Sequence, residues 1–217
     1  MTTGTLDQKK KPNQVLIQPS KGWVGLRLRD LWDYRELIYF LTWRDIKVRY
    51  KQSVLGIMWA IINPFMSMVV YTIFFGTLAK IPSDGVPYPI FSYTALLPWI
   101  LFSSALSVAS RSMVSSGNMI SKIYFPRMIV PLASVMSSVV DFFIAFIILI
   151  GMMFFYSITP TIALLWLPLL ILLALISALG VGFWFSALMV RYRDVGYLMP
   201  FVTELWKFLT PVVYPAS

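Results

Sequence analysis

Three ionisable side chains lie inside long apolar stretches of this sequence, where a charge is costly to keep: Asp141, Glu204 and Lys207. Glu204 and Lys207 are three residues apart, so on a helix they share a face and can neutralise each other. That spacing favours a structural pair over a proton relay. Asp141 has no partner within one helical turn. We expect it to face the interior of a helix bundle, a water-filled cavity or a cation from another helix.

The residues that most catalytic sites need are missing from the sequence. There is no Cys and no His, which excludes thiolate nucleophiles, imidazole bases and almost every zinc site. No Gly-x-x-x-x-Gly-Lys-[Ser/Thr] phosphate loop occurs. Asp84 and Asp194 stand alone in their loops, whereas a diphosphate-bound cation needs an acidic cluster. We therefore predict a chain that is not an enzyme, with no catalytic residue, no metal site, no cofactor and no ATPase site of its own.

The composition predicts an all-α polytopic membrane protein. Hydrophobic residues make up 59% of the chain and charged residues only 12%, with a mean hydropathy of +0.77. Charged side chains are therefore too sparse to cover a soluble globule. A membrane-spanning helix needs about 20 mostly apolar residues. By that measure, five spans are predicted, at residues 55–79, 90–114, 128–156, 162–190 and 197–214.

The positive charges predict the orientation of the spans. The chain has 18 Lys and Arg against 9 Asp and Glu, and most of these basic residues precede the first span or lie in alternate loops. Only Lys80 lies in a loop on the opposite side. Because Lys and Arg are enriched in cytoplasmic loops, we expect a cytoplasmic N-terminus and, after five spans, an external C-terminus. Basic residues gathered between spans do not form the shared exposed surface that a nucleic acid needs, so we predict no nucleic-acid binding.

The segment before the first span predicts a helix on the membrane surface. We divide the chain into a cytoplasmic segment (1–29), an amphipathic interface helix (30–52) and a transmembrane domain (53–217). Apolar side chains recur at helical spacing in the second of these. They are Leu31, Tyr34, Leu37, Ile38 and Leu41. Such a helix is either an interfacial anchor or a surface whose polar face docks a cytoplasmic partner.

A second short helix is predicted at residues 118–125, between the second and third spans. Gly117 can end the preceding span, Asn118 can cap a new helix, and Pro126 must stop it. This apolar segment either lies against lipid headgroups or fits a socket on a partner protein. Within the fourth span, small residues recur at every fourth position, which predicts close packing against another helix. They are Ala174, Ala178, Gly182 and Ser186.

Seven motifs stand in order along nearly the whole chain. The longest runs from Trp43 to Trp59 and reads Trp-Arg-Asp-Ile-Lys-Val-Arg-Tyr-Lys-Gln-Ser-Val-Leu-Gly-Ile-Met-Trp. The others are residues 31–37, 82–89, 97–99, 122–127, 190–195 and 210–215. Together they resemble the permease subunits of type-2 ABC exporters for bacterial surface polysaccharides, a family that covers O-antigen, capsule and teichoic acid exporters.

The resemblance implies a function and partners. It implies a homodimeric permease in the bacterial cytoplasmic (inner) membrane, paired with two copies of an ABC ATPase subunit that carries the ATP and Mg. The cargo would be a lipid-linked polysaccharide, with O-antigen as the leading expectation. By position, 30–52 would be the interface helix and 118–125 the coupling helix. The implied ATPase contacts are Glu36, Arg44, Asp45, Lys47, Asn118, Met119, Ile120, Ser121, Lys122, Ile123 and Tyr124.

The family's conduit implies a substrate path along the first and fifth spans, lined by aromatic side chains. Aromatic faces stack on sugar rings without fixing their register, which suits a sliding cargo. The candidates are Tyr71, Phe74, Phe75, Trp206 and Tyr214. The alternative for each of them is an interfacial or lipid-facing aromatic.

Three expectations remain open at this point. The family usually has a sixth span, so the five spans found here suggest an incomplete permease. An exporter of teichoic acid, small lipids or drugs shares the same architecture. From other classes, the sequence leaves an intramembrane transferase acting on lipid-linked sugars, which would need an acidic pair, and a passive membrane scaffold.

Overall fold

The computed structural model describes residues 28–51, 56–83 and 85–210, and all regular secondary structure in them is helical. Two helices lie before the first span: α1 (Leu28–Asp33) and α2 (Arg35–Lys51). The long apolar helices then follow in chain order, with a four-residue helix between two of them. They are α3 (Met58–Tyr71) with the π-helix η1 (Thr72–Leu78), α4 (Tyr88–Ser115), α5 (Gly117–Ile120), α6 (Ile129–Phe155), the 3-10 helix η2 (Ile162–Trp166), α7 (Leu167–Arg191) and α8 (Val195–Leu209).

Four helical segments are long and apolar enough to cross a membrane, and they match the first four predicted spans closely. They are Met58–Leu78, Tyr88–Ser115, Ile129–Phe155 and Ile162–Arg191. The all-α polytopic fold is therefore confirmed. The fifth predicted span, 197–214, extends beyond the described residues, and α8 has 15 residues within them. A fifth crossing therefore stays a prediction.

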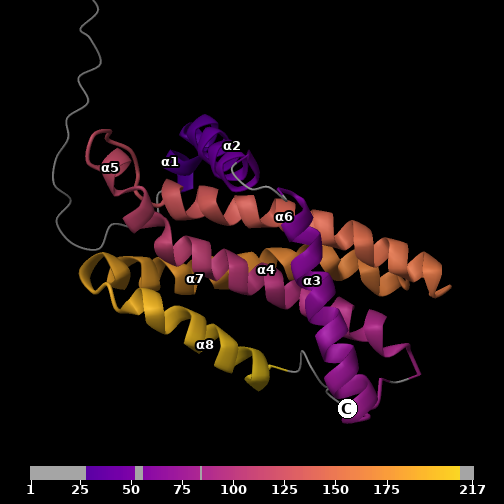
Figure 1. Ribbon diagram of the computed structural model, residues 1–217. Helices are drawn as coiled ribbons and strands as arrows, with labels where there is room; N and C mark the ends of the chain where they lie inside the picture. The colour runs from indigo at the N-terminus through magenta and orange to yellow at the C-terminus, as the bar shows by residue number, and fades with distance from the viewer. Residues whose placement is uncertain (1–27, 52–55, 84, 211–217) are drawn as a thin grey trace, which may run out of the picture.

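Helix α4 lies at the centre of the bundle, with α6 on one side and α7 on the other (Figure 1). α3 crosses these helices, and α8 runs beside the end of the bundle where α4 ends and α6 begins. Tyr93 of α4 is fully buried and donates its hydroxyl hydrogen to the carbonyl of Ala145 in α6, at 3.0 Å. In this way a polar side chain in the apolar interior is satisfied by the neighbouring helix.

The stripe of small residues on α7 packs against α4, as its spacing predicts. Ala178 and Ser186 are buried, and Gly182 lies directly against Ala109 of α4. A Cβ atom on Gly182 would come within 2.6 Å of the Cβ atom of Ala109. The absence of a side chain at this position therefore sets the distance between the two helices.

We expect Gly182→Ala to lower the free energy of unfolding by about 1–3 kcal/mol, because the added methyl group must push α7 from α4. Gly180 is the matched control, since nothing lies within 4 Å of a Cβ atom built there. Gly180→Ala should leave the melting temperature unchanged or slightly higher. Thermal unfolding of the purified chain in detergent measures both, and equal melting temperatures would contradict the close α4–α7 contact.

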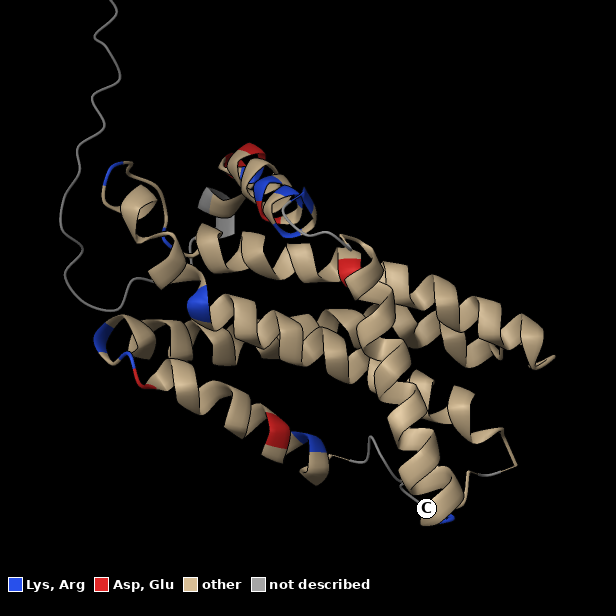
Figure 2. Ribbon diagram, viewed as in Figure 1, with Lys and Arg blue, Asp and Glu red and all other residues tan. Residues whose placement is uncertain are grey.

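Basic residues gather along α2 and at one end of the bundle, where α4 ends, α6 begins and α7 turns into α8 (Figure 2). We call this the basic end. The opposite end carries very few charges. This distribution is what the positive-inside rule expects of a cytoplasmic face, and the orientation itself stays a prediction.

Candidate functional site

A groove of about 740 Å³ lies between α3–η1 and α8. Its lining mixes aromatic rings with amide, hydroxyl and charged groups. The residues are Asn63, Met66, Ser67, Val70, Tyr71, Phe74, Phe75, Ala79, Glu204, Lys207 and Phe208. Five residues singled out from the sequence, three aromatic and two charged, are thus brought together by helices more than a hundred residues apart. We call this the aromatic groove.

The rings in the aromatic groove form an ordered face. Tyr71 and Phe75 stack, with centroids 5.4 Å apart and planes 18° from parallel. Phe74 leaves 57% of its surface exposed. On the α8 side, Lys207 forms an ion pair with Glu204, and its Nζ atom lies 5.8 Å from the Tyr71 ring centroid. The pair predicted from its spacing therefore forms, and it sits against the aromatic face.

The π-helical turn η1 carries Phe74 and Phe75. In a π-helix the backbone bonds run from residue i to residue i+5, as between the Phe74 carbonyl and the Ala79 amide at 2.9 Å. η1 also packs tightly on the start of α4, since a Cβ atom on Gly76 would lie 2.8 Å from Cγ of Tyr88. Phe74 remains exposed to the groove, whereas Phe75 also packs against Leu96 of α4.

One of the two other predicted path residues, Trp206, lies elsewhere. Trp206 is directed away from the aromatic groove and meets Phe102 of α4 edge to face, with ring centroids 5.4 Å apart. It belongs to a separate apolar pocket between α4, α7 and α8. Tyr214 lies outside the described residues. Of the four aromatic candidates within the described residues, the groove contains three.

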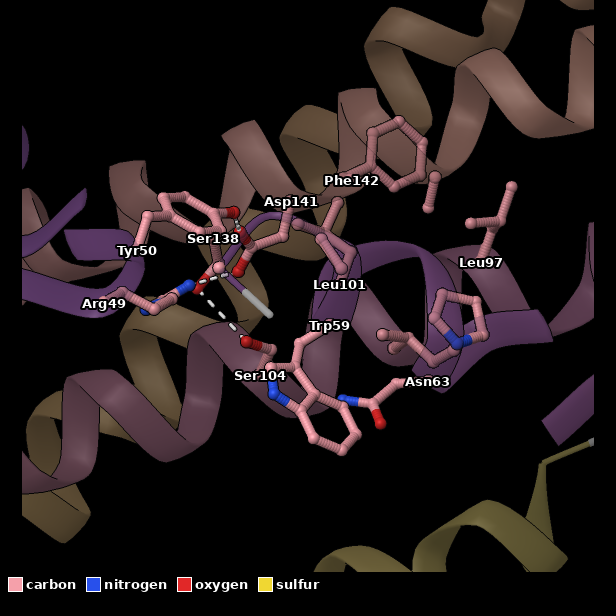
Figure 3. A pocket seen from close by; sticks show the side chains of 15 residues that line it. Arg49, Tyr50, Trp59, Asn63, Leu97, Leu101, Ser104, Ser138, Asp141 and Phe142 are labelled. Atoms are coloured by element: carbon pink, nitrogen blue, oxygen red, sulfur yellow. Dashed lines mark hydrogen bonds and ion pairs between the residues drawn. The ribbon is translucent and has the colours of Figure 1, made fainter. Parts of the chain in front are cut away.

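Asp141 finds its partner on another helix, which is one of the alternatives that the sequence left open. Its carboxylate accepts hydrogen bonds from the Arg49 guanidinium and from the Tyr50 hydroxyl, both at the end of α2 (Figure 3). Arg49 also donates to the Ser137 hydroxyl at 3.1 Å. The ion pair is largely shielded, because the Arg49 and Asp141 side chains are only 32% and 25% exposed. This cluster of Arg49, Tyr50, Ser137 and Asp141 is called the α2–α6 clasp.

The surroundings of the clasp favour the protonated form of the Tyr50 hydroxyl. Burial raises the pKa of the Tyr50 hydroxyl well above its ordinary value, and the hydrogen bond to Asp141 raises it further. Tyr50 therefore remains protonated at physiological pH and able to donate its hydroxyl hydrogen. A cavity of about 270 Å³ adjoins the clasp, with Trp59 and Asn63 on one side and Phe142 on the other (Figure 3).

Sequence reasoning missed Arg49 and Tyr50, although a signal was present. Polar residues recur on α6 with the spacing of one helical face: Ser134, Ser137, Ser138 and Asp141. Thr42, Asp45 and Arg49 do so on α2. The two polar faces meet. Ser134 donates to Asp45 at 3.1 Å, and Thr42 donates to the Ala133 carbonyl at 3.2 Å.

The two predicted ATPase-contact segments lie side by side at the basic end. The helix α5 has four residues and is followed by turns, so it is shorter than the predicted 118–125. Met119 and Ile120 pack inward with Leu37, Ile38 and Leu41 of α2. The outward side chains of the segment are Asn118, Ser121, Lys122, Ile123 and Tyr124. A partner could therefore touch only this second group.

On α2, the four predicted contacts also divide into an exposed pair and a half-buried pair. Glu36 and Lys47 are exposed, and Lys47 lies over the Trp43 ring with its Nζ atom 5.2 Å from the centroid. Arg44 and Asp45 are half-buried and pair with each other at 2.8 Å. Arg44 also contacts the Met119 sulfur at 3.7 Å and so joins α2 to α5.

Comparisons with known proteins agree with the fold. The model of the family described as ABC-2 type transporter matches residues 36–217. The chain is 30% identical over 191 residues to the O-antigen export system permease protein RfbA of Myxococcus xanthus, covering 88% of this chain and 72% of that protein. It is also 30% identical over 183 residues to the protein of the same name from Klebsiella pneumoniae, covering 84% and 70%. The chain therefore belongs to the ABC-2 type transporter family, as an all-helical, multi-pass membrane protein.

Proposed function

We propose that this chain is the permease subunit of an ATP-driven exporter that moves a lipid-linked polysaccharide, O-antigen in the first instance, outward across the bacterial cytoplasmic membrane. In this proposal two copies of the chain form the conduit, two copies of a separate ABC ATPase bind and hydrolyse ATP, and the N-terminus is cytoplasmic. The relatives named as O-antigen export permeases support the choice of cargo.

The aromatic groove is the observation that carries the proposal. It joins the first described span to α8, and it presents ring faces beside hydroxyl, amide and charged groups. The apolar faces of sugar rings can stack on Tyr71, Phe74 and Phe75, while sugar hydroxyls can bond to Glu204 and Asn63. Contacts of this kind hold a polysaccharide weakly at each position, so the chain can advance.

The docking of the ATPase is proposed on the outward residues of the segment after α5, together with Glu36 and Lys47 of α2. Ile123 is 60% exposed and Tyr124 is 70% exposed. Large apolar side chains this exposed at a basic, polar end of a protein favour an interaction with another protein. The inward contacts of Met119 and Ile120 would then transmit the position of this segment to α2.

We expect Ile123→Asp and Tyr124→Ala to uncouple ATP hydrolysis from export, because they remove apolar docking contacts. Surface polysaccharide should fall at least fivefold, which corresponds to about 1 kcal/mol of lost contact free energy. Tyr192→Ala is the matched control, since Tyr192 is also an exposed aromatic at the basic end, beyond α7. The measurement is surface polysaccharide in a strain that lacks the chromosomal gene, with the ATPase rate of the co-purified complex.

That same strain tests the proposed function directly. Loss of surface polysaccharide on deletion, restored by the wild-type chain only when the ATPase partner is active, is the expected result. Unchanged surface polysaccharide together with a loss of drug resistance or lipid export would show that another cargo is moved. Normal coupling of ATP hydrolysis to export in Ile123→Asp would contradict the proposed docking site.

A further inference from the structure

A second groove, of about 470 Å³, opens between α2, α4 and α6 at the basic end. It is distinct from the aromatic groove, which lies between α3–η1 and α8. Arginine and serine side chains dominate its lining. The residues are Arg44, Asp45, Val48, Arg49, Ser107, Val108, Arg111, Ser115, Ser116, Ser134 and Ser137. We call it the arginine groove.

Hydrogen-bond donors outnumber acceptors in the arginine groove. Arg44 uses Nε and Nη2 on Asp45, and its Nη1 has only the Met119 sulfur at 3.7 Å. Arg111 forms no ion pair and no side-chain hydrogen bond within the part of the chain that the structure describes. Three guanidinium groups thus line this space, but Arg49 is paired with Asp141 and Arg44 with Asp45, so among the described residues Arg111 is the lining arginine without a carboxylate partner. An anion with several oxygens would supply the acceptors that are missing.

The depth of the groove in the membrane narrows the choice of anion. α4 has 28 residues, so it is about 42 Å long, whereas the hydrocarbon core of a bilayer is about 30 Å thick. The last turns of α4, which carry Arg111 and Ser115, therefore reach the headgroup layer. The anionic groups at that level are lipid phosphates. Basic pockets between membrane helices on the cytoplasmic side bind such headgroups.

We infer that the arginine groove binds the phosphate of an anionic membrane phospholipid, with Arg111 and Arg44 as the charged donors and the groove hydroxyls as further contacts. The bound lipid would bridge α4 to α2. This inference concerns the surrounding bilayer, and it holds whichever cargo the exporter moves.

The experiment measures thermal stabilisation of the purified complex in neutral detergent on titration with phosphatidylglycerol. The wild-type protein should show a saturable rise in melting temperature. Arg111→Gln should weaken the apparent affinity roughly tenfold, the loss expected for one charge-assisted hydrogen bond. Arg127→Gln is the matched control, because Arg127 is an exposed arginine at the same end but outside the groove. It removes the same charge and should titrate like the wild type.

A parallel titration with a polyprenyl diphosphate separates the two sources of lipid phosphate. Stabilisation by phosphatidylglycerol that depends on Arg111, with no Arg111-dependent effect of the diphosphate, supports the phospholipid site. A larger Arg111-dependent effect of the diphosphate would overturn it, as would equal titrations for Arg111→Gln and Arg127→Gln. Surface polysaccharide is measured in the same variants. A failure of the proposed export function would appear there without altering the lipid titration.

Discussion

Asp141→Ala is expected to lower the free energy of unfolding by about 2–4 kcal/mol. The substitution leaves the Arg49 guanidinium with Ser137 alone and the Tyr50 hydroxyl without its acceptor. Both groups sit in the shielded α2–α6 clasp, where water replaces the lost bonds poorly. Thermal unfolding of the purified chain in detergent measures the change. Surface polysaccharide should fall in parallel, because α2 loses its ion pair with α6.

Two further variants distinguish the loss of the clasp contacts from a general effect of removing a charge. Arg49→Met combined with Asp141→Leu removes both charges together, and it should be more stable than Asp141→Ala alone, since no unpaired charge remains. Asp33→Ala removes an exposed carboxylate on α1 and should change stability by less than about 0.5 kcal/mol. If Asp141→Ala unfolded at the same temperature as Asp33→Ala, the clasp would contribute nothing to stability.

Tyr71→Ala combined with Phe74→Ala is expected to reduce surface polysaccharide about tenfold or more without loss of the protein from the membrane. Each ring is expected to contribute about 0.5–1.5 kcal/mol of stacking on a passing sugar, and two rings together account for a change of that size. Phe74 is 57% exposed, so its removal costs little packing. Surface polysaccharide and the amount of chain in the membrane are measured together.

Two controls accompany this prediction. One keeps an aromatic ring at position 71, and the other removes an aromatic side chain outside the groove. Tyr71→Phe retains the stack on Phe75 and should export nearly as well as the wild type. Phe154→Ala removes an aromatic that is 80% exposed at the end of α6, away from the aromatic groove, and should have no effect. Equal polysaccharide levels in the double variant and in Phe154→Ala would exclude the groove as the path.

The aromatic groove could be anticipated only in part from the sequence. The spacing of Glu204 and Lys207 was enough to predict their ion pair, and the family resemblance identified Tyr71, Phe74 and Phe75. Trp206 shows the limit of such reasoning. It follows Glu204 by two residues, about 200° around a helix, so the two side chains point to nearly opposite sides of α8. Because α8 carries aromatic residues on both sides, composition alone cannot say which side faces the groove.

The α2–α6 clasp was harder to predict. The apolar stripe of α2 suggested a helix lying on lipid, and that stripe does pack, against the start of α6 and the segment after α5. The predicted contacts with a cytoplasmic partner on this segment were Glu36, Arg44, Asp45 and Lys47. Asp45 instead meets α6, as do Thr42 and Arg49, which had no predicted contact. Pairing two helices about ninety residues apart requires knowledge of which surfaces touch, and a single sequence does not contain it.

The attachment of α2 has a mechanical consequence. Along the chain, α2 comes just before α3, yet its main contacts are with α6. Force applied to α2 is therefore also delivered to α6, through the ion pair and hydroxyl contacts that join the two helices. α3, which lines the aromatic groove, follows α2 along the chain and has its own contacts with α4 and α6. A load on α2 is thus shared with a helix about ninety residues further along the chain.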